Sequence, residues 1–314
     1  MRDYREFLGV SDLAKEASDG EGVKVAVIDT GIPAIDAILV SRASNLSTER
    51  INACLDREHA TFVGSLLFGS RRIVGVCPKA TACFCKVFSN NTTSQKLVAQ
   101  AIRHAVDEWH AEVINLSLGF SGRKDCSGPL KNACEYAAEK NVLLVAASGN
   151  DGGITMWPAG LDAVISVGAS DGEEKEDFSN AGKVDVVIHG RDLEGFDCNG
   201  DITTKTGTSF STALVSGVLA LIIAKRRKAG ESCSRLDVMH ELISHCIDIG
   251  PEGKDSETGY GMLSFVGETR FKLTNLTDLH KSKFSAKIIS VIGIAVKAIW
   301  SAVKSLWRSN RDDQ

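Results

Sequence analysis

The stretch Gly-Thr-Ser-Phe-Ser-Thr-Ala at residues 207–213 leads directly into an apolar segment at 214–224. A glycine turn followed by a long apolar run predicts the start of a buried helix, with Ser209 in its first turn. The first turn of a helix carries unpaired N–H groups and the positive end of the helix dipole, which would stabilise an oxyanion beside Ser209. The stretch therefore indicates either a serine nucleophile for acyl transfer or an ordinary N-cap. A base and an acid are needed to decide between them.

An acid and a base both occur upstream, at the ends of predicted elements. Residues 23–28 are almost all apolar and predict a buried strand that ends at Asp29. Open α/β sheets place their chemistry at the carboxyl ends of the strands. His59 precedes small and apolar residues at 60–68, which predict a buried helix that starts at His59. Taken singly, Asp29 is equally well explained as a turn former and His59 as a hydrogen-bonded histidine at a helix N-terminus.

In the order Asp29, His59, Ser209, these motifs resemble those of the subtilisin-like serine peptidases, the subtilases. The matching segments are Val-Ile-Asp-Thr-Gly at 27–31, His-Ala-Thr-Phe-Val-Gly at 59–64, Ala-Ser-Gly-Asn at 147–150, Gly-Thr-Ser at 207–209 and Val-Ser-Gly at 215–217. The resemblance covers about residues 20 to 265. It implies a doubly wound α/β fold, with a mainly parallel sheet and helices on both faces, in a peptidase domain at residues 1–270.

The resemblance implies a serine endopeptidase with defined catalytic roles. Ser209 would be the nucleophile, His59 would take its proton and return it to the leaving amine, and Asp29 would fix the tautomer of His59. Asn150 would complete the oxyanion hole together with the backbone N–H of Ser209. The alternative is a catalytically silent scaffold that binds extended peptides without cutting them. A serine esterase or amidase ranks behind both, because the Gly-x-Ser-x-Gly pattern is absent around Ser209.

The resemblance also implies a set of residues that contact the substrate, from two parts of the chain. They are Ser117, Leu118, Gly119, Ala147, Ser148, Gly149 and Met156. The first three belong to the segment at 113–119, which resembles the strand that pairs with the substrate backbone. Met156 stands where the family commonly has a small residue at the base of the primary specificity pocket. We therefore expect a shallow pocket that favours small or slender P1 side chains.

Three positions depart from the pattern of the family. Ala60 replaces a glycine, Phe210 a methionine and Ala213 a proline. None of these changes removes a reactive group, but the packing behind Ser209 would differ, so we expect weaker or more selective activity. The histidine and proline that often follow the aspartate motif are also absent. No cofactor is predicted, and the calcium that the resemblance suggests has no clear site in the sequence.

The composition is that of a globular enzyme. With 314 residues, 43% of them hydrophobic and 24% charged, the chain can bury one large α/β core. A net charge of −4 gives no overall attraction to nucleic acid, and the partner that the family resemblance implies is a polypeptide substrate. The nine cysteines are an odd number without a Cys-x-x-Cys pair. They predict free, mostly buried thiols in a reducing compartment.

The two ends of the chain carry separate predictions. The first 20 residues lack the apolar core of a secretory signal, which predicts a cytoplasmic enzyme that folds without a pro-domain, or else a piece of a longer chain. The tail at 271–314 lies outside the resemblance. Within it, lysines recur at helical spacing opposite apolar residues at 284–307, which predicts a basic amphipathic helix. This helix would lie on an anionic membrane, dock onto a partner or pack on the catalytic domain.

Overall fold

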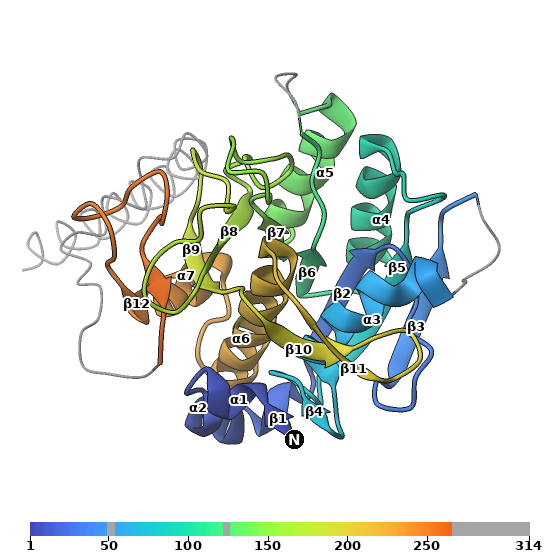
Figure 1. Cartoon of the computed structure of the whole chain (residues 1–314), viewed down its shortest axis with the longest axis horizontal. Helices are drawn as coiled ribbons and strands as arrows, with labels where there is room; N and C mark the ends of the chain where they lie inside the picture. Colours follow the sequence, from blue (N-terminus) through green and yellow to red (C-terminus); the bar gives the residue numbers. More distant parts are fainter. Residues whose placement is uncertain (49–53, 122–125, 266–314) are drawn as a thin grey trace, which may run out of the picture. The chain divides into compact units, whose positions relative to one another are not determined.

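The computed structural model describes residues 1–48, 54–121 and 126–265 and contains a nine-stranded sheet with helices on both faces (Figure 1). The strands lie in the order β12, β13, β9, β8, β7, β6, β2, β5, β3, and all neighbours are parallel except β12 and β13. Their bounds are β2 Lys24–Asp29, β3 Val40–Asn45, β5 Thr81–Lys86, β6 Val113–Leu116, β7 Leu143–Ala147, β8 Val164–Ser170, β9 Val186–His189, β12 Cys246–Ile247 and β13 Met262–Leu263. The predicted α/β fold with a mainly parallel sheet is confirmed.

The central strands are continuous apolar runs, as expected of strands that are covered on both faces. Every residue of β6 and β7 is buried, and β2 buries all of its residues except Lys24. β5 and β3 lie on one side of β2, and β6 to β9 lie on the other. The winding of the chain therefore reverses at β2, which ends at Asp29. Doubly wound sheets bind their ligands outside the carboxyl ends of the strands at such a reversal.

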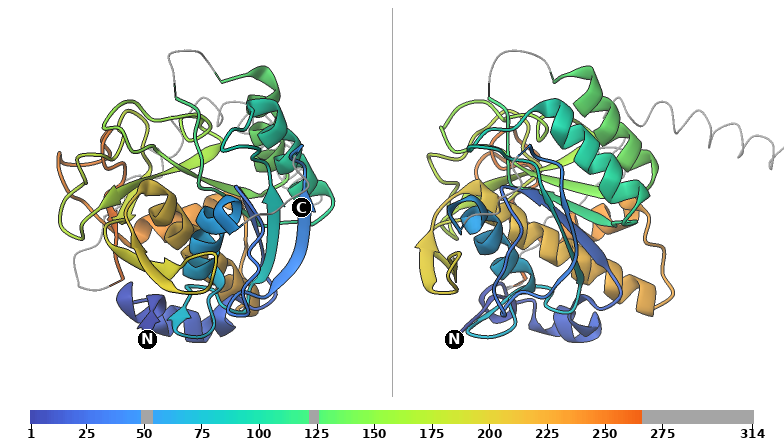
Figure 2. Two further views of the ribbon diagram at one scale, coloured as in Figure 1. Left: turned by 45° about the vertical axis from the view of Figure 1, so that its right-hand side comes forward. Right: turned by 90° about the vertical axis from the view of Figure 1, so that its right-hand side faces the viewer.

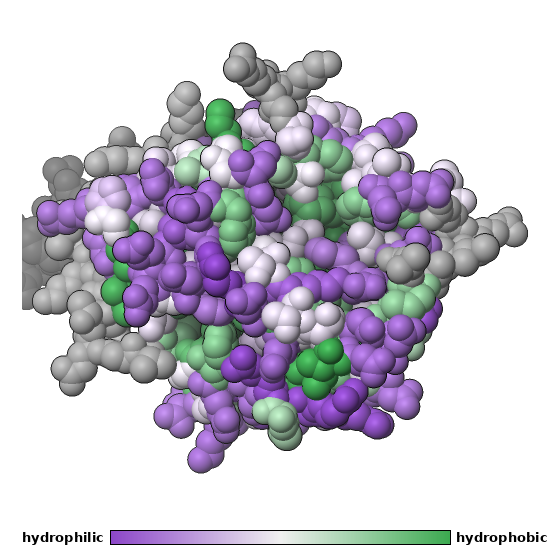
Figure 3. All heavy atoms as spheres, viewed as in Figure 1, coloured by the Kyte–Doolittle hydropathy of each residue, from purple (hydrophilic) through white to green (hydrophobic). Residues whose placement is uncertain are grey.

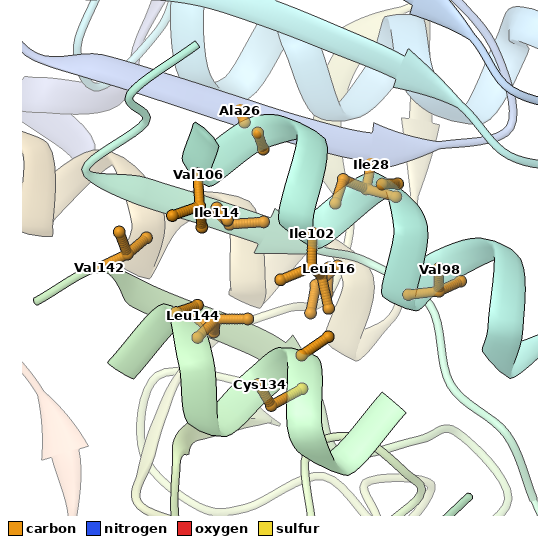
Figure 4. Close-up of a cluster of buried hydrophobic side chains, with 14 of the residues drawn as sticks. Ala26, Ile28, Val98, Ile102, Val106, Ile114, Leu116, Cys134, Val142 and Leu144 are labelled. Atoms are coloured by element: carbon orange, nitrogen blue, oxygen red, sulfur yellow. The ribbon is translucent and has the colours of Figure 1, made fainter. Parts of the chain in front are cut away.

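Helices cover the sheet in two layers. α4 (Gln95–Asp107) and α5 (Gly128–Glu139) bury apolar side chains in a cluster that includes Ala26 and Ile28 of β2 (Figure 4). α3 (Cys54–Phe68) and α6 (Thr208–Lys228) pack together on the other face, as Figure 2 shows from two further directions. α6 is long and apolar enough to cross a membrane, but 89% of its apolar window is buried inside the protein. It is the core helix that the sequence predicted, with Ser209 in its first turn.

The remaining elements border this core. They are β1 Arg2–Asp3, α1 Tyr4–Phe7, α2 Ser11–Glu16, the 3-10 turn Ser18–Gly20, β4 Ile73–Val74, β10 Leu193–Phe196, β11 Ile202–Lys205 and α7 Arg235–Ser244. β10 and β11 form an antiparallel hairpin that immediately precedes α6. The described part of the face in Figure 3 is mostly hydrophilic, with apolar residues in small separate groups. The predicted tail at 271–314, with its amphipathic helix at 284–307, lies outside the described residues.

The start of α3 corrects one prediction. The apolar run at 60–68 indicated a helix that begins at His59, but α3 begins five residues earlier, at Cys54. The added turn contains three consecutive charged residues, of which Asp56 and Glu58 form ion pairs with lysines outside the helix. Such long-range pairs leave no periodic apolar pattern in the sequence. His59 therefore lies in the second turn of α3 and not at its N-terminus.

A disulfide corrects a second prediction. Cys54 and Cys198 are bonded, with their Cα atoms 5.3 Å apart, although 144 residues separate them in the sequence. The bond joins the start of α3 to the turn of the β10–β11 hairpin. The other seven cysteines are free and most of them are buried, as predicted. The pairing was missed because a connectivity over this separation cannot be deduced from cysteine spacing.

We expect reduction of the Cys54–Cys198 disulfide to lower the free energy of unfolding by about 2–5 kcal/mol, because the bond closes a long loop and restricts the unfolded chain. Urea unfolding with and without dithiothreitol measures this difference. The double variant Cys54→Ser/Cys198→Ser should unfold at the lower urea concentration under both conditions. Equal stability of the wild-type protein with and without the reductant would contradict the prediction.

Candidate active site

The side chain of Asp29 is buried at the end of β2 and faces α3. Side chains alternate between the two faces of a strand, and Ala26 and Ile28 point into the cluster under α4 and α5 (Figure 4). Asp29 therefore points to the opposite face, where its side chain is 1% exposed. Its Oδ1 accepts a hydrogen bond from Nδ1 of His59 at 2.8 Å and another from the backbone N–H of Thr30 at 2.6 Å. The sequence-predicted acid and base are thus in direct contact.

This hydrogen bond fixes the tautomer of His59. A carboxylate can only accept hydrogen bonds, so the proton between the two groups belongs to Nδ1. In the neutral imidazole, Nε2 is then the acceptor and can take up a proton from another group. The ring of His59 lies 5.7 Å from the ring of Phe210, the residue that follows Ser209. The basic nitrogen is therefore held in the neighbourhood of the predicted nucleophile.

Four influences act on the pKa of His59, and their net effect raises it above the ordinary value of 6.5. Burial is the largest and lowers the pKa, because it disfavours the charged imidazolium. The charge of Asp29 and its hydrogen bond both raise the pKa, whereas the charge of Lys205 lowers it. The balance shows that Asp29 stabilises the protonated form of His59 by more than burial destabilises it.

Ser209 is the second residue of α6, directly after a turn that requires glycine. Gly207 is the N-cap and has φ 154° and ψ 157°, a conformation that residues with a Cβ rarely adopt. The hydroxyl of Ser209 donates to the carbonyl of Ser117 at 3.3 Å, and the hydroxyl of Ser117 donates to the carbonyl of Ser209 at 2.7 Å. A hydroxyl has one proton, so the proton of Ser209 must turn away from this carbonyl before the hydroxyl can donate to His59.

A buried network holds Ser117 in place below Ser209. Nδ2 of Asn115 donates to the hydroxyl of Ser117 at 2.9 Å, and the hydroxyl of Ser216 donates to Oδ1 of Asn115 at 3.0 Å. Asn115 is the third residue of β6, and Ser216 lies two turns into α6. The network therefore fixes the position of Ser209 relative to the end of the sheet. Neither Asn115 nor Ser216 was predicted from the sequence as part of the site.

The side-chain amide of Asn150 is oriented by its contacts with the first residue of α6. Its Oδ1 accepts hydrogen bonds from the backbone N–H of Thr208 at 2.8 Å and from the Thr208 hydroxyl at 2.9 Å. A backbone N–H can bond only to the oxygen of the amide, so this contact fixes which way the amide group is turned. Nδ2 is left to donate to a ligand. Asn150 and Ser209 line the same pocket, so both can face one ligand there.

That pocket has a volume of about 270 Å³, and its lining includes five of the seven residues predicted to contact substrate. The lining consists of Leu118, Gly119, Ala147, Gly149, Asn150, Asp151, Met156, Thr208 and Ser209. Of the other two predicted residues, Ser117 supports Ser209, and Ser148 is fully buried, with its carbonyl accepting from the backbone N–H of Met156 at 2.8 Å. Asp151 and Thr208 were not predicted, although each adjoins a motif residue.

Met156 lines the pocket and packs close to two of the glycines that line it. A Cβ added to Gly119 would lie 2.9 Å from Cβ of Met156, and one added to Gly149 would lie 3.0 Å from its Cγ. Only glycine leaves room for the methionine at these two positions. As for metals, no group of three or more His, Cys, Asp and Glu side chains is gathered as a metal site in 1–48, 54–121 and 126–265.

A buried acid–histidine pair, a serine at a helix start and an oriented asparagine amide together agree with the sequence profile of the subtilase family, which matches residues 20–261. The chain belongs to the subtilase family. The predicted resemblance is confirmed, and the chain is a subtilase in a family of serine-type endopeptidases.

Individual subtilases are similar over different shares of their length. The minor extracellular protease Epr of Bacillus subtilis (strain 168) is 27% identical over 84% of this chain, which spans 41% of Epr. The intracellular serine protease of Paenibacillus polymyxa is 28% identical over 88% of each chain. The structure of the prenylagaramide maturation protease PagA is 30% identical, with a TM-score of 0.69, over 81% of this chain and 96% of that chain.

We expect Asp29→Asn to lower the pKa of His59 from above 6.5 to below it. The substitution removes the charge that raises the pKa, and it leaves burial and the charge of Lys205, which both lower it. NMR titration of the histidine ring signals measures the pKa, and the spectrum of His59→Gln assigns the signal. The signals of the other histidines serve as internal controls. An unchanged His59 titration in Asp29→Asn would refute this account of the pair.

Proposed function

We propose that the protein is a serine endopeptidase that cleaves peptide bonds in polypeptides through an acyl-enzyme intermediate. Membership of the subtilase family supports the reaction class. The observation that carries the assignment of residues is the hydrogen bond from Nδ1 of His59 to the buried Asp29. This bond leaves Nε2 as a base beside the segment that carries Ser209. The calcium suggested by the family resemblance has no role in this assignment.

In the first step, the Ser209 hydroxyl leaves the carbonyl of Ser117 and turns towards Nε2 of His59. Nε2 takes the proton while Oγ attacks the carbonyl carbon of the scissile peptide bond. Asp29 stays ionised and stabilises the imidazolium through the hydrogen bond to Nδ1. The raised pKa of His59 means that its neutral form prevails only above pH 6.5, so kcat/KM should rise as the pH increases through that region.

The second step collapses the tetrahedral intermediate. Nδ2 of Asn150 and the backbone N–H of Ser209 donate to the oxyanion, and His59 returns its proton to the leaving amine. Water then attacks the acyl-enzyme with His59 as the base, and the acid product leaves with Ser209 regenerated. The orientation of Asn150 by Thr208 supports this role, because a donor that is already turned to the ligand needs no reorganisation during the reaction.

A catalytically silent peptide-binding scaffold is the second candidate. The observation that favours it is the bond from the Ser209 hydroxyl to the carbonyl of Ser117, which points the proton away from His59. In both candidates an extended peptide would pair with the backbone at 117–119 and place a side chain in the pocket above Met156. The two differ in whether Ser209 can be acylated.

Labelling with a fluorophosphonate probe, followed by intact mass, tests this difference. We expect the wild-type protein to gain one adduct and Ser209→Ala to gain none. Asn150→Ala should still label but lower kcat for peptide hydrolysis by about 10²–10³, the loss measured for one oxyanion donor in subtilisin. Folded wild-type protein that takes up no probe would favour the silent scaffold. Labelling of Ser209→Ala would assign the nucleophile elsewhere.

We propose further that Met156 restricts the P1 side chain to small or slender groups. Met156→Gly should raise kcat/KM for a P1 Phe peptide relative to a P1 Ala peptide by about tenfold to a hundredfold, because the larger side chain gains buried apolar contact. Met156→Leu conserves the volume and is the matched control, and its ratio should stay close to that of the wild type. The proposal fails if Met156→Gly leaves the ratio of the two substrates unchanged.

We propose that the protein acts inside the cell. The similarity to the intracellular protease of P. polymyxa supports this location. The Cys54–Cys198 disulfide conflicts with the expectation of thiols kept fully reduced, because cytosolic disulfides are usually catalytic or redox-sensing. Fractionation of cells that produce the protein, with thiol trapping of the cysteines, locates it and reports the state of the bond.

A further inference from the structure

The helical turn just before His59 is tied to the rest of the protein by three of its side chains. These contacts are the Cys54–Cys198 disulfide, the Asp56–Lys86 ion pair at 3.4 Å and the Glu58–Lys205 ion pair at 2.6 Å. Two of the three lead to the β10–β11 hairpin, which Figure 1 shows beside α3. Neither of these two contacts includes a residue of the proposed catalytic site.

The hairpin packs closely on α3 and then leads into Ser209. A Cβ added to Gly195 of β10 would lie 2.8 Å from the ring of Phe62, so this ring packs against the backbone of β10 where a side chain would clash. The backbone N–H of Phe196 donates to the hydroxyl of Ser65 at 3.2 Å. β11 ends at Lys205, and Ser209 follows four residues later. The hairpin therefore packs on α3, the helix of His59, at one side and leads within four residues to Ser209 at the other.

Lys205 makes the contact at the end of this hairpin. Its side chain is 27% exposed, its Nζ lies 2.6 Å from Oε1 of Glu58, and it lies 5.6 Å from the centre of the Phe62 ring. Glu58 and Phe62 are four residues apart and share one face of α3, so Lys205 spans the turn that contains His59. The charged groups that act on His59 are Asp29 of β2 and Lys205 of β11, and Lys205 is itself paired with Glu58 on α3.

We infer that Lys205 is a positioning residue of the peptidase: through Glu58 and Phe62 it holds α3 against the segment that enters α6, and so aligns Nε2 of His59 with Oγ of Ser209. The inference rests on the proposed function. A partly exposed ion pair contributes little to global stability. By contrast, a misplacement of about 1 Å between reacting groups can cost about 10²-fold in rate. Loss of Lys205 should therefore affect catalysis much more than folding.

The test compares Lys205→Met with two other variants. Lys205→Arg keeps the charge. Lys225→Met removes a similar ion pair, the 3.0 Å contact between Lys225 and Glu241. Lys225 lies on α6, 16 residues after Ser209, and is thus about 24 Å from it. We measure kcat and KM for a peptide, the pH profile of kcat/KM, and the melting temperature. Glu58→Gln repeats the test from the other partner, should Lys205→Met fail to fold.

We expect Lys205→Met to lower kcat by about tenfold to a hundredfold with little change in KM or melting temperature. The acidic limb of the pH profile of kcat/KM should move to higher pH in Lys205→Met, because the charge that lowers the pKa of His59 is gone. Lys205→Arg should restore both kcat and the limb, and Lys225→Met should match the wild type. Unchanged kcat in Lys205→Met and Glu58→Gln, a loss confined to KM, or an equal loss in Lys225→Met would each overturn the inference.

Fluorophosphonate labelling separates this inference from the proposed function. If the wild-type protein neither labels nor cleaves peptides, the proposed function itself fails. If the wild type labels and cleaves while Lys205→Met does so equally well, only the positioning role of Lys205 is lost.

Discussion

The hydrogen bond between Asp29 and Nδ1 of His59 is the interaction on which the rest of the site depends. It joins the end of β2 to α3, which covers the opposite face of the sheet from α4 and α5. The bond therefore requires the pleat of β2 to turn the side chain of Asp29 towards α3. The second carboxylate oxygen is buried without a hydrogen-bond partner in the described part of the chain. A buried carboxylate that is only partly satisfied gains most when a positive charge forms beside it, and the protonated His59 supplies that charge.

The nucleophile depends on a different kind of restraint. Ser209 lies at the start of α6, the most buried of the helices in the described residues, and the hydroxyls of Ser117 and Ser216 with the amide of Asn115 connect that start to β6. Each member of this buried network finds a partner within it, which is the condition under which polar groups in a core make a structure rigid. The acid–base pair and the nucleophile are therefore held by two neighbouring strands, β2 and β6. The packing of α3 on α6 and on the segment before α6 adds to their mutual alignment.

The sequence predicted the parts of the site that carry a local signal. Asp29, His59, Asn150 and Ser209 stand in short motifs with a glycine turn or an apolar run, so their neighbours alone indicate their place. The predicted start of α3 was wrong because its first turn is held by ion pairs with lysines that are distant in the sequence. The Cys54–Cys198 bond and the Lys205–Glu58 pair join residues 144 and 147 positions apart, and no local periodicity records such a contact. Ser117 was predicted to meet substrate, yet its hydroxyl supports Ser209 from below.

The disulfide has a topological consequence for the proposed peptidase. It closes a covalent ring from Cys54 to Cys198, which contains α3 and the strands from β5 to β9 and leaves β2 and α6 outside. A single break in any loop of that ring yields two pieces that are still joined, so a molecule nicked by its neighbours would migrate as one chain until it is reduced. The helix of His59 would then stay fastened to the hairpin that leads to Ser209. In this way the bond would make the proposed peptidase tolerant of cleavage by its own copies.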